Sequence, residues 1–140
     1  MKVSSRFRYG LRLLVDLAAN YKKGPVLLKE IARCEKISKK YLEQIVITLR
    51  AAGIISAIRG SKGGYFLTKS PNKIKILDVY KILEGQFAPV DCLDNKRICT
   101  LTETCPTRPL WTLLSDAIKK TFQNVTLADL LKDNKGNFPK

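Results

Sequence analysis

The stretch from Ile37 to Leu67, ISKKYLEQIVITLRAAGIISAIRGSKGGYFL, constrains the fold of this chain more than any other. An apolar stripe at helical spacing from Leu42 to Leu49 predicts a helix that begins after Ser38 and ends at about Ala52. Two short runs typical of β-strands follow, and the glycine-rich segment RGSKGG between them predicts a hairpin. With a short helix expected just upstream, this pattern predicts a winged helix-turn-helix, a mostly α fold with a small β-hairpin wing.

Apolar periodicity predicts further helices on both sides of this stretch. They run from Ser5 to Asn20, capped by Ser4 or Ser5; from Val26 to Cys34; from Ile76 to Leu83, ending at Gly85; from Pro109 to Phe122; and from Thr126 to Lys132. Cys34 is expected on the buried side of its short helix, as a small packed thiol. The tail from Asp133 is expected to be loose.

The positive charge of the chain lies almost entirely in its first half. Residues 1–75 carry 17 Lys and Arg against four acidic side chains, whereas residues 76–140 carry nine against eight. This segregation indicates a polyanionic partner, with nucleic acid the leading candidate over a merely solvated basic face. No apolar run approaches the roughly 18 residues of a membrane span, and the N-terminus lacks a signal-peptide pattern, so we expect a cytoplasmic protein.

The exposed face of the predicted third helix carries side chains suited to a DNA major groove. Lys40 can bind phosphate or guanine, Glu43 can accept a hydrogen bond from the cytosine amino group, and Gln44 can pair with adenine. Arg59 and Lys62 at the hairpin tip can follow a phosphate backbone or enter a narrow minor groove. A plain solvated hairpin is the alternative; a nucleotide phosphate loop is excluded, because its glycine spacings are missing.

Three of the four cysteines, Cys92, Cys99 and Cys105, lie within one short segment. Stable disulfides are not expected in the cytoplasm, where closely spaced thiols more often bind a metal or respond to redox state. The spacing alone leaves a metal site, redox-active thiols and structural cysteines open, because the chain has neither a CxxC pair nor a histidine.

The long helix after Pro109 has an apolar face too wide for a single contact. One side can pack on its own domain and the other on a second subunit, which predicts a dimerisation helix; packing within one core is the alternative. A two-fold dimer would place two recognition helices on a palindromic DNA site. We therefore divide the chain into a winged helix-turn-helix DNA-binding domain at residues 1–75 and a cysteine-containing sensor and dimerisation region at residues 76–140.

The sequence also resembles a known family over nearly its whole length. The opening MKVSSRFRYGLRLLVDLA, the run YLEQIVITLRAAGIISAIRGSKGGYFL, the three-cysteine segment and the ending PLWTLLSDAIKKTFQNVTLADLL are similar to the iron-sulfur cluster regulator (IscR-like) family of bacterial winged-helix transcription factors. The resemblance implies a DNA-binding homodimer with an iron-sulfur cluster, 2Fe-2S or 4Fe-4S, on Cys92, Cys99 and Cys105. It also implies DNA contacts by Lys40, Tyr41, Glu43, Gln44 and Arg59, which together with Ser61 and Lys62 of the hairpin tip are the predicted DNA-binding residues.

The ligand set of that family is not complete in this chain. Where the iron-sulfur cluster regulator has a histidine after the last cysteine, this chain has Arg108, and a protonated arginine cannot ligate a metal. Arg8 stands where the nitric-oxide-sensing relatives supply a carboxylate. Asp91, Asp94 or Glu103, an external thiol and water are the candidates for the fourth ligand.

Three hypotheses about function follow from these patterns. The first is a sequence-specific transcription regulator controlled by an iron-sulfur cluster. The second is a winged-helix regulator whose cysteines sense redox state or bind another metal directly. The third, a small iron-sulfur electron carrier or enzyme, is disfavoured by the basic first half and by the lack of any nucleophile and base arrangement, so we expect no enzymatic activity.

Overall fold

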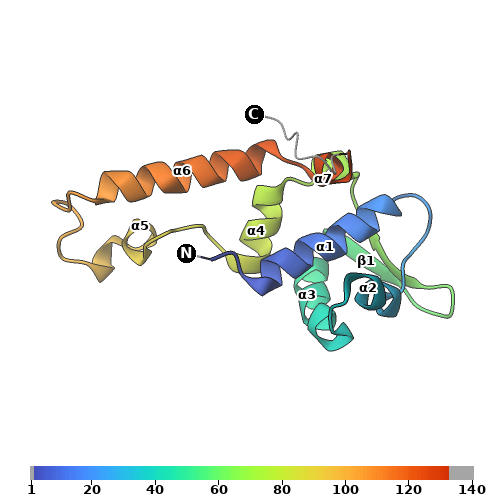
Figure 1. Cartoon of the computed structure of the whole chain (residues 1–140). Coiled ribbons are helices and arrows are strands. Elements are labelled where there is room, and N and C mark those ends of the chain that lie inside the picture. The colour runs from blue at the N-terminus through green and yellow to red at the C-terminus, as the bar shows by residue number, and fades with distance from the viewer. Residues whose placement is uncertain (1, 133–140) are drawn as a thin grey trace.

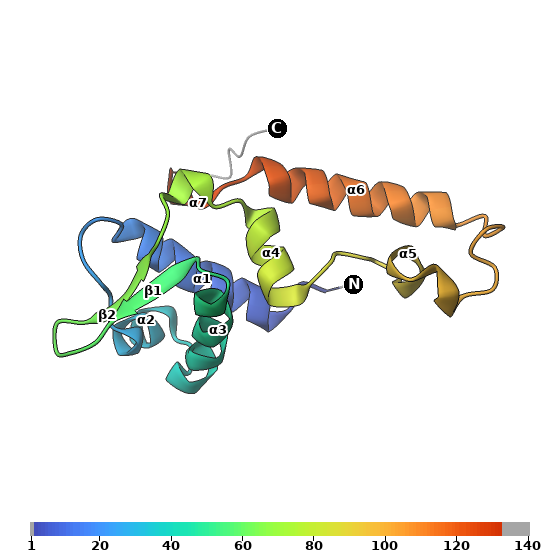
Figure 2. The ribbon, with the colours of Figure 1, turned by 180° about the vertical axis from the view of Figure 1, so that it is seen from behind.

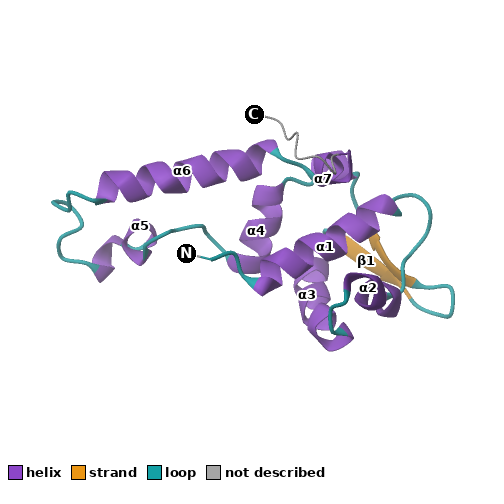
Figure 3. Cartoon of the chain, in the orientation of Figure 1, coloured by secondary structure: helices purple, strands orange, loops and turns teal. Residues whose placement is uncertain are grey.

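The computed structural model describes residues 2–132, so the tail from Asp133 lies outside the described residues. The elements are α1 (Ser5–Ala19), α2 (Leu28–Glu35), α3 (Lys39–Ala51), β1 (Ile55–Ile58), β2 (Gly64–Leu67), the 3-10 turn η1 (Pro71–Lys73), α4 (Ile76–Glu84), α5 (Asp91–Asp94), the 3-10 turn η2 (Lys96–Ile98), α6 (Arg108–Asn124) and α7 (Leu127–Lys132). Figure 3 shows that helices dominate and that the strands form a single hairpin within this range, which confirms the predicted fold class. None of these helices combines the length and apolar character that crossing a membrane requires.

Local hydrogen bonds define the ends of the helix-turn-helix and of the helix that precedes it. The hydroxyl groups of Ser4 and Ser38 accept hydrogen bonds from the backbone N–H three residues further on, at 3.0 and 3.1 Å, so each serine is the N-cap of its helix. Lys36 ends α2 in the left-handed conformation, with φ of 54°. Gly53 adopts φ of 78° just after α3, which turns the chain into β1.

Helix α1 lies at the centre of the fold. Its residues Leu13, Leu14 and Leu17 are fully buried, and it packs against α2, α3, α4, α7 and β2. Gly10 lets α1 approach α4 closely, because a side chain at this position would overlap Leu83. The apolar stripe predicted for α1 therefore faces several partners at once, and the recognition helix α3 is one of them.

The wing is paired with the segment that precedes α2. Strands β1 and β2 are antiparallel, with Ile55 opposite Leu67 and Ile58 opposite Gly64. Val26, which the sequence assigned to the second helix, instead exchanges two backbone hydrogen bonds with Tyr65, at 2.9 and 2.8 Å. This pairing ties the hairpin to the turn after α1.

Figures 1 and 2, seen from opposite sides, show α6 and α5 extending to one side of the part formed by α1 to α4 and the hairpin. The last turns of α6 join this part through Phe122, whose ring centroid lies 5.6 Å from that of Phe7 and 5.7 Å from that of Tyr80. The chain then returns to the first part, where Leu127 of α7 is fully buried. Two hydrogen bonds, from Ile76 N to Val125 O and from Leu127 N to Ile74 O, fix this return.

The prediction that Cys34 is buried is wrong, because its side chain is exposed. Helix α2 has only eight residues, and its buried side is defined by Leu28 and Ile31. At about 100° per residue, Cys34 lies about 60° beyond Ile31, on the side away from Leu28. Helical spacing alone did not define the centre of the buried face in so short a helix.

Candidate nucleic-acid interface and cysteine segment

The polar face of α3 points to solvent. Leu42, Ile45, Val46 and Leu49 form its buried stripe, and the predicted DNA-binding residues Lys40, Tyr41, Glu43 and Gln44 are exposed on the opposite side. Ile47, an apolar residue on the same face, is 65% exposed. The expected division of this helix into a core face and an open face is confirmed, while contacts of these side chains with DNA stay a prediction.

A groove of about 500 Å³ lies between the two helices of the helix-turn-helix and the wing. Glu43 of α3 and Ser61 of the hairpin tip both line it, so the fold brings two predicted site residues from different elements to one surface. Two basic residues that the sequence analysis did not select, Lys29 and Lys39, line the same groove. Lys39 Nζ lies 3.7 Å from Glu43 Oε1, an exposed pair between residues four apart on the helix. That spacing is visible in the sequence, whereas the approach of Lys29 to the wing is not.

The hairpin tip carries its side chains outward. Arg59, Ser61 and Lys62 are exposed, and a backbone hydrogen bond from Gly63 N to Gly60 O closes the turn at 3.0 Å. Gly60 has φ of 111°, a conformation that other residues rarely adopt. In the described part of the chain no ion pair involves Arg59 or Lys62, so both cations face solvent.

Two side-chain contacts with α1 fix the orientation of α3. Arg6 Nη2 donates a hydrogen bond to Thr48 Oγ1 at 2.7 Å. The ring of Tyr9 meets the ring of Tyr41 edge to face, with centroids 5.5 Å apart. Neither contact could be predicted from the sequence, because nothing in the spacing of either helix indicates which residues meet across the interface.

The three clustered cysteines are spread along the segment that leads to α6. Cys92 lies in α5, Cys99 follows η2 and Cys105 precedes α6, and all three thiols are free. Within residues 2–132, no group of three or more His, Cys, Asp and Glu side chains is arranged to hold a metal ion. Thiolates are the ligands that an iron-sulfur cluster needs, but the three cysteines as arranged here do not fit a cluster site.

Other contacts hold the cysteine segment in place. Arg108 Nη1 donates to the backbone oxygen of Cys92 at 2.8 Å, so the residue at the position of the family's histidine ties α6 to α5. Thr102 Oγ1 donates to Cys99 O at 2.7 Å. Of the candidate fourth ligands, Glu103 lies 3.7 Å from Lys96 and is exposed, as are Asp91 and Asp94.

The thiol of Cys105 is hydrogen-bonded to the residues that follow it. Its Sγ lies 3.3 Å from Thr107 Oγ1. This hydrogen bond, aided by backbone hydrogen bonds from Thr107 and Arg108 and by the charge of Arg108, lowers the pKa of Cys105 below its ordinary value. A lower pKa gives more thiolate at neutral pH, which is the reactive form and the metal-binding form.

A helix-turn-helix with an open polar face, next to a basic β-hairpin, defines a winged-helix DNA-binding protein. The family model for Rrf2, described as an iron-dependent transcriptional regulator, matches residues 3–133, and the chain belongs to this family. It is therefore a DNA-binding transcription regulator and not an enzyme, which confirms those two predictions and, separately, the family resemblance.

Named relatives cover almost the whole chain. The HTH-type transcriptional regulator CymR of Bacillus subtilis (strain 168) is 40% identical over 130 residues, which is 93% of this chain and 89% of that protein. Its solved structure, described as that of the global cysteine regulator, superposes with a TM-score of 0.80 at 38% identity, covering 94% of this chain and 97% of that one. The structure of IscR from T. potens also has a TM-score of 0.80, at 33% identity over 100% of this chain and 93% of that one.

The lowered pKa of Cys105 leads to a test of thiol reactivity. We expect Thr107→Val to slow alkylation of Cys105 by iodoacetamide at pH 7, because loss of the hydroxyl group raises the thiol pKa and reduces the thiolate fraction. The two rates should converge at high pH, where both thiols are ionised. Mass spectrometry of the peptide containing Cys105 measures the rate, and Thr104→Val is the matched control. Identical pH profiles for Thr107→Val and the unmodified protein would contradict this assignment.

Proposed function

We propose that this regulator acts in the cytoplasm as a homodimer that recognises a palindromic operator. Recognition of DNA is supported above all by the groove between α3 and the wing, which Lys29 and Lys39 help to line. DNA phosphates are attracted by this basic surface, and the polar face of α3 supplies groups that distinguish bases. The concentration of positive charge in residues 1–75 supports the same surface.

Each predicted contact residue has a separate role in this proposal. Gln44 and Glu43 read base edges in the major groove, where an amide pairs with adenine and a carboxylate accepts from cytosine. Lys40 and Tyr41, near the start of the same helix, also contact the DNA. In the wing, Arg59 enters the minor groove, while Ser61 and Lys62 contact the backbone. The contacts of Arg6 and Tyr9 with α3 support these roles by holding the recognition helix in one orientation.

We infer dimerisation from the surface of α6. Among the seventeen residues of this helix only Ser115 is buried, and the large apolar side chains of Leu110 and Leu113 are 57% and 69% exposed. A helix with so much apolar surface in water is stabilised by a partner, and a second copy of α6 offers the same surface in return. A two-fold pair would give the dimer two recognition helices.

We propose that the cysteine segment makes DNA binding responsive to a signal, and two chemistries are compatible with it. An iron-sulfur cluster is supported by the three thiols and by the iron-dependent description of the family, but it requires the thiols to come together. Direct thiol chemistry is favoured by the lowered pKa of Cys105. Iron and sulfide content of protein purified without oxygen separates the two: a colourless, iron-free sample supports direct thiol chemistry and rejects the cluster.

The roles of α3 and the wing are separable by mutation. We expect Gln44→Ala to lose discrimination worth about 1–3 kcal/mol at one base pair of each half-site. Lys62→Ala, which removes one cation from each subunit, should weaken binding to all sequences alike and reduce the salt slope of the dimer by about 2. Fluorescence anisotropy on an operator selected from random DNA, at 50 to 200 mM salt, measures both effects. Lys81→Ala, which removes an exposed lysine of α4, is the charge control. Binding that does not respond to salt would reject the DNA-contact assignment.

Dimerisation through α6 can be tested by substitution on its exposed apolar face. Leu113→Glu should weaken dimerisation roughly 100-fold or more, because two symmetry-related leucines lose their burial and two charges take their place. Thr112→Glu is the matched control, since Thr112 is exposed one residue earlier on the polar side of the helix. Sedimentation velocity over a range of protein concentrations gives the dissociation constants. A dimer of unchanged affinity in Leu113→Glu would show that α6 is not the interface.

A further inference from the structure

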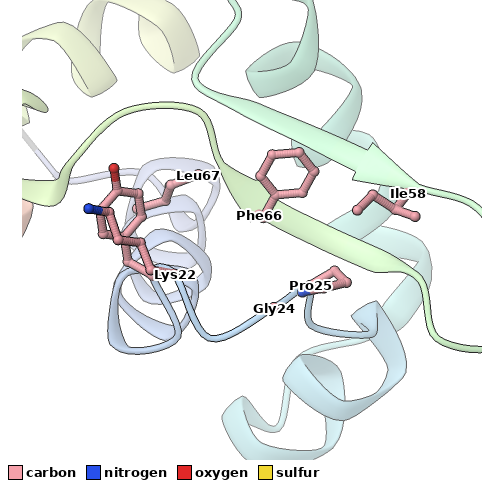
Figure 4. Close-up of a pocket in the computed structure, with 7 residues that line it drawn as sticks. Lys22, Gly24, Pro25, Ile58, Phe66 and Leu67 are labelled. Carbon is pink, nitrogen blue, oxygen red and sulfur yellow. The ribbon is translucent and has the colours of Figure 1, made fainter.

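We propose that a cavity behind the wing binds a small apolar carboxylate and that its occupant tightens DNA binding. The cavity has a volume of about 310 Å³ and lies between the turn after α1 and the hairpin (Figure 4). Tyr21, Lys22 and Pro25 line it from the turn, and Ile58, Phe66 and Leu67 line it from the hairpin. Its size falls at the lower end of the range for small-molecule sites in proteins.

The apolar walls of the cavity favour a ligand with an apolar group. Figure 4 shows the ring of Phe66, the ring of Pro25 and the side chain of Ile58 arranged around the same space. Ile58, the last residue of β1, is 51% exposed. An aromatic or branched aliphatic group placed here would release water from these surfaces, and that release favours binding.

The rim of the cavity selects for a negative charge. Lys22 is an exposed lining residue of the cavity, and its Nζ lies 5.7 Å from the centre of the ring of Tyr21, which also lines it. Within residues 2–132, no acidic side chain lines the cavity and no ion pair involves Lys22. The ammonium group is therefore available to a carboxylate on the ligand, whereas a cationic ligand would be repelled.

The backbone holds Lys22 in the left-handed conformation. Lys22 has φ of 63°, and within residues 2–132 only Lys36 shares a positive φ among residues other than glycine. This conformation is uncommon for a lysine. A backbone hydrogen bond from Lys23 N to Asn20 O, at 2.9 Å, closes the turn that holds it.

Occupation of the cavity would act on the wing through the residues that line it. Ile58 directly precedes Arg59 at the hairpin tip, and the Val26–Tyr65 hydrogen bonds join the two walls beside the cavity. A ligand wedged between the turn and the hairpin would restrict the hairpin to one orientation. DNA binding then no longer has to order the wing. We therefore expect the affinity of the protein for DNA to rise about 5-fold or more. This effect on DNA rests on the proposed function, while binding of the ligand does not.

Binding is tested on the free, full-length protein with phenylacetate as the probe. In a ¹H–¹⁵N NMR titration we expect saturable shifts of the amides of residues 21–24, 58, 66 and 67. Lys22→Asn should weaken binding about 10-fold, because it removes the charge while asparagine tolerates the left-handed backbone. Lys23→Asn, the neighbouring lysine that does not line the cavity, should leave binding unchanged.

The controls separate this site from general effects. Phenylacetamide, which is neutral, and phenethylamine, which is cationic, should bind more weakly than phenylacetate. Absence of saturable shifts at these residues, or equal losses in Lys22→Asn and Lys23→Asn, would overturn the site. Shifts at these residues that grow with protein concentration alone would show that a second copy covers the cavity and would also overturn it.

The effect on DNA is measured afterwards with the wild-type protein and a selected operator. A 5-fold or larger gain in affinity at saturating phenylacetate supports the coupling between cavity and wing, and an unchanged or weaker affinity rejects it. Failure of the wild-type protein to bind any DNA in the absence of probe would reject the proposed function instead, because the cavity is assayed without DNA.

Discussion

Helix α1 packs against α2, α3, α4, α7 and β2, so its burial positions elements from both ends of the chain. Leu13, Leu14 and Leu17 are fully buried among helices from both ends of the chain, and each such leucine contributes about 1.5–3 kcal/mol. The same helix contacts α3 on one side and α4 and α7 on others. Helix α1 therefore positions both the recognition helix and the C-terminal part of the chain. A displacement of either one changes its contacts with α1.

Helix α6 is connected to α1 through a small set of contacts. Phe7, Tyr80 and Phe122 form an aromatic cluster where α1, α4 and the end of α6 meet. Ser4, the N-cap of α1, also donates a hydrogen bond to Glu84, the last residue of α4 before the cysteine segment begins. A rearrangement of that segment can reach α1 by this route, and Arg6 and Tyr9 on α1 contact α3 directly. Contacts through α1 therefore connect the end of α4 with the DNA-binding surface.

Much of the local structure could be predicted from the sequence because it depends on local chemistry. The Ser38 cap, the turn at Gly53 and the open face of α3 follow from hydrogen bonding, glycine conformation and periodicity within one short stretch. Contacts between distant segments could not be predicted in the same way. The groove contributed by Lys29, the bond from Arg6 to Thr48 and the pairing of Val26 with the wing depend on how elements meet in space. Sequence proximity likewise grouped Cys92, Cys99 and Cys105, although the fold does not bring them together as a metal site.

The central claim is that two copies of this chain bind DNA as a symmetric pair of winged helices. Hydroxyl-radical footprinting on a selected operator tests it most directly, because the method reports protection at each backbone position on both strands. We expect two equivalent sets of protections related by a two-fold axis, with centres about 34–36 Å apart or a multiple of this spacing. A single asymmetric stretch of protection, with one protein chain bound per DNA, would contradict it.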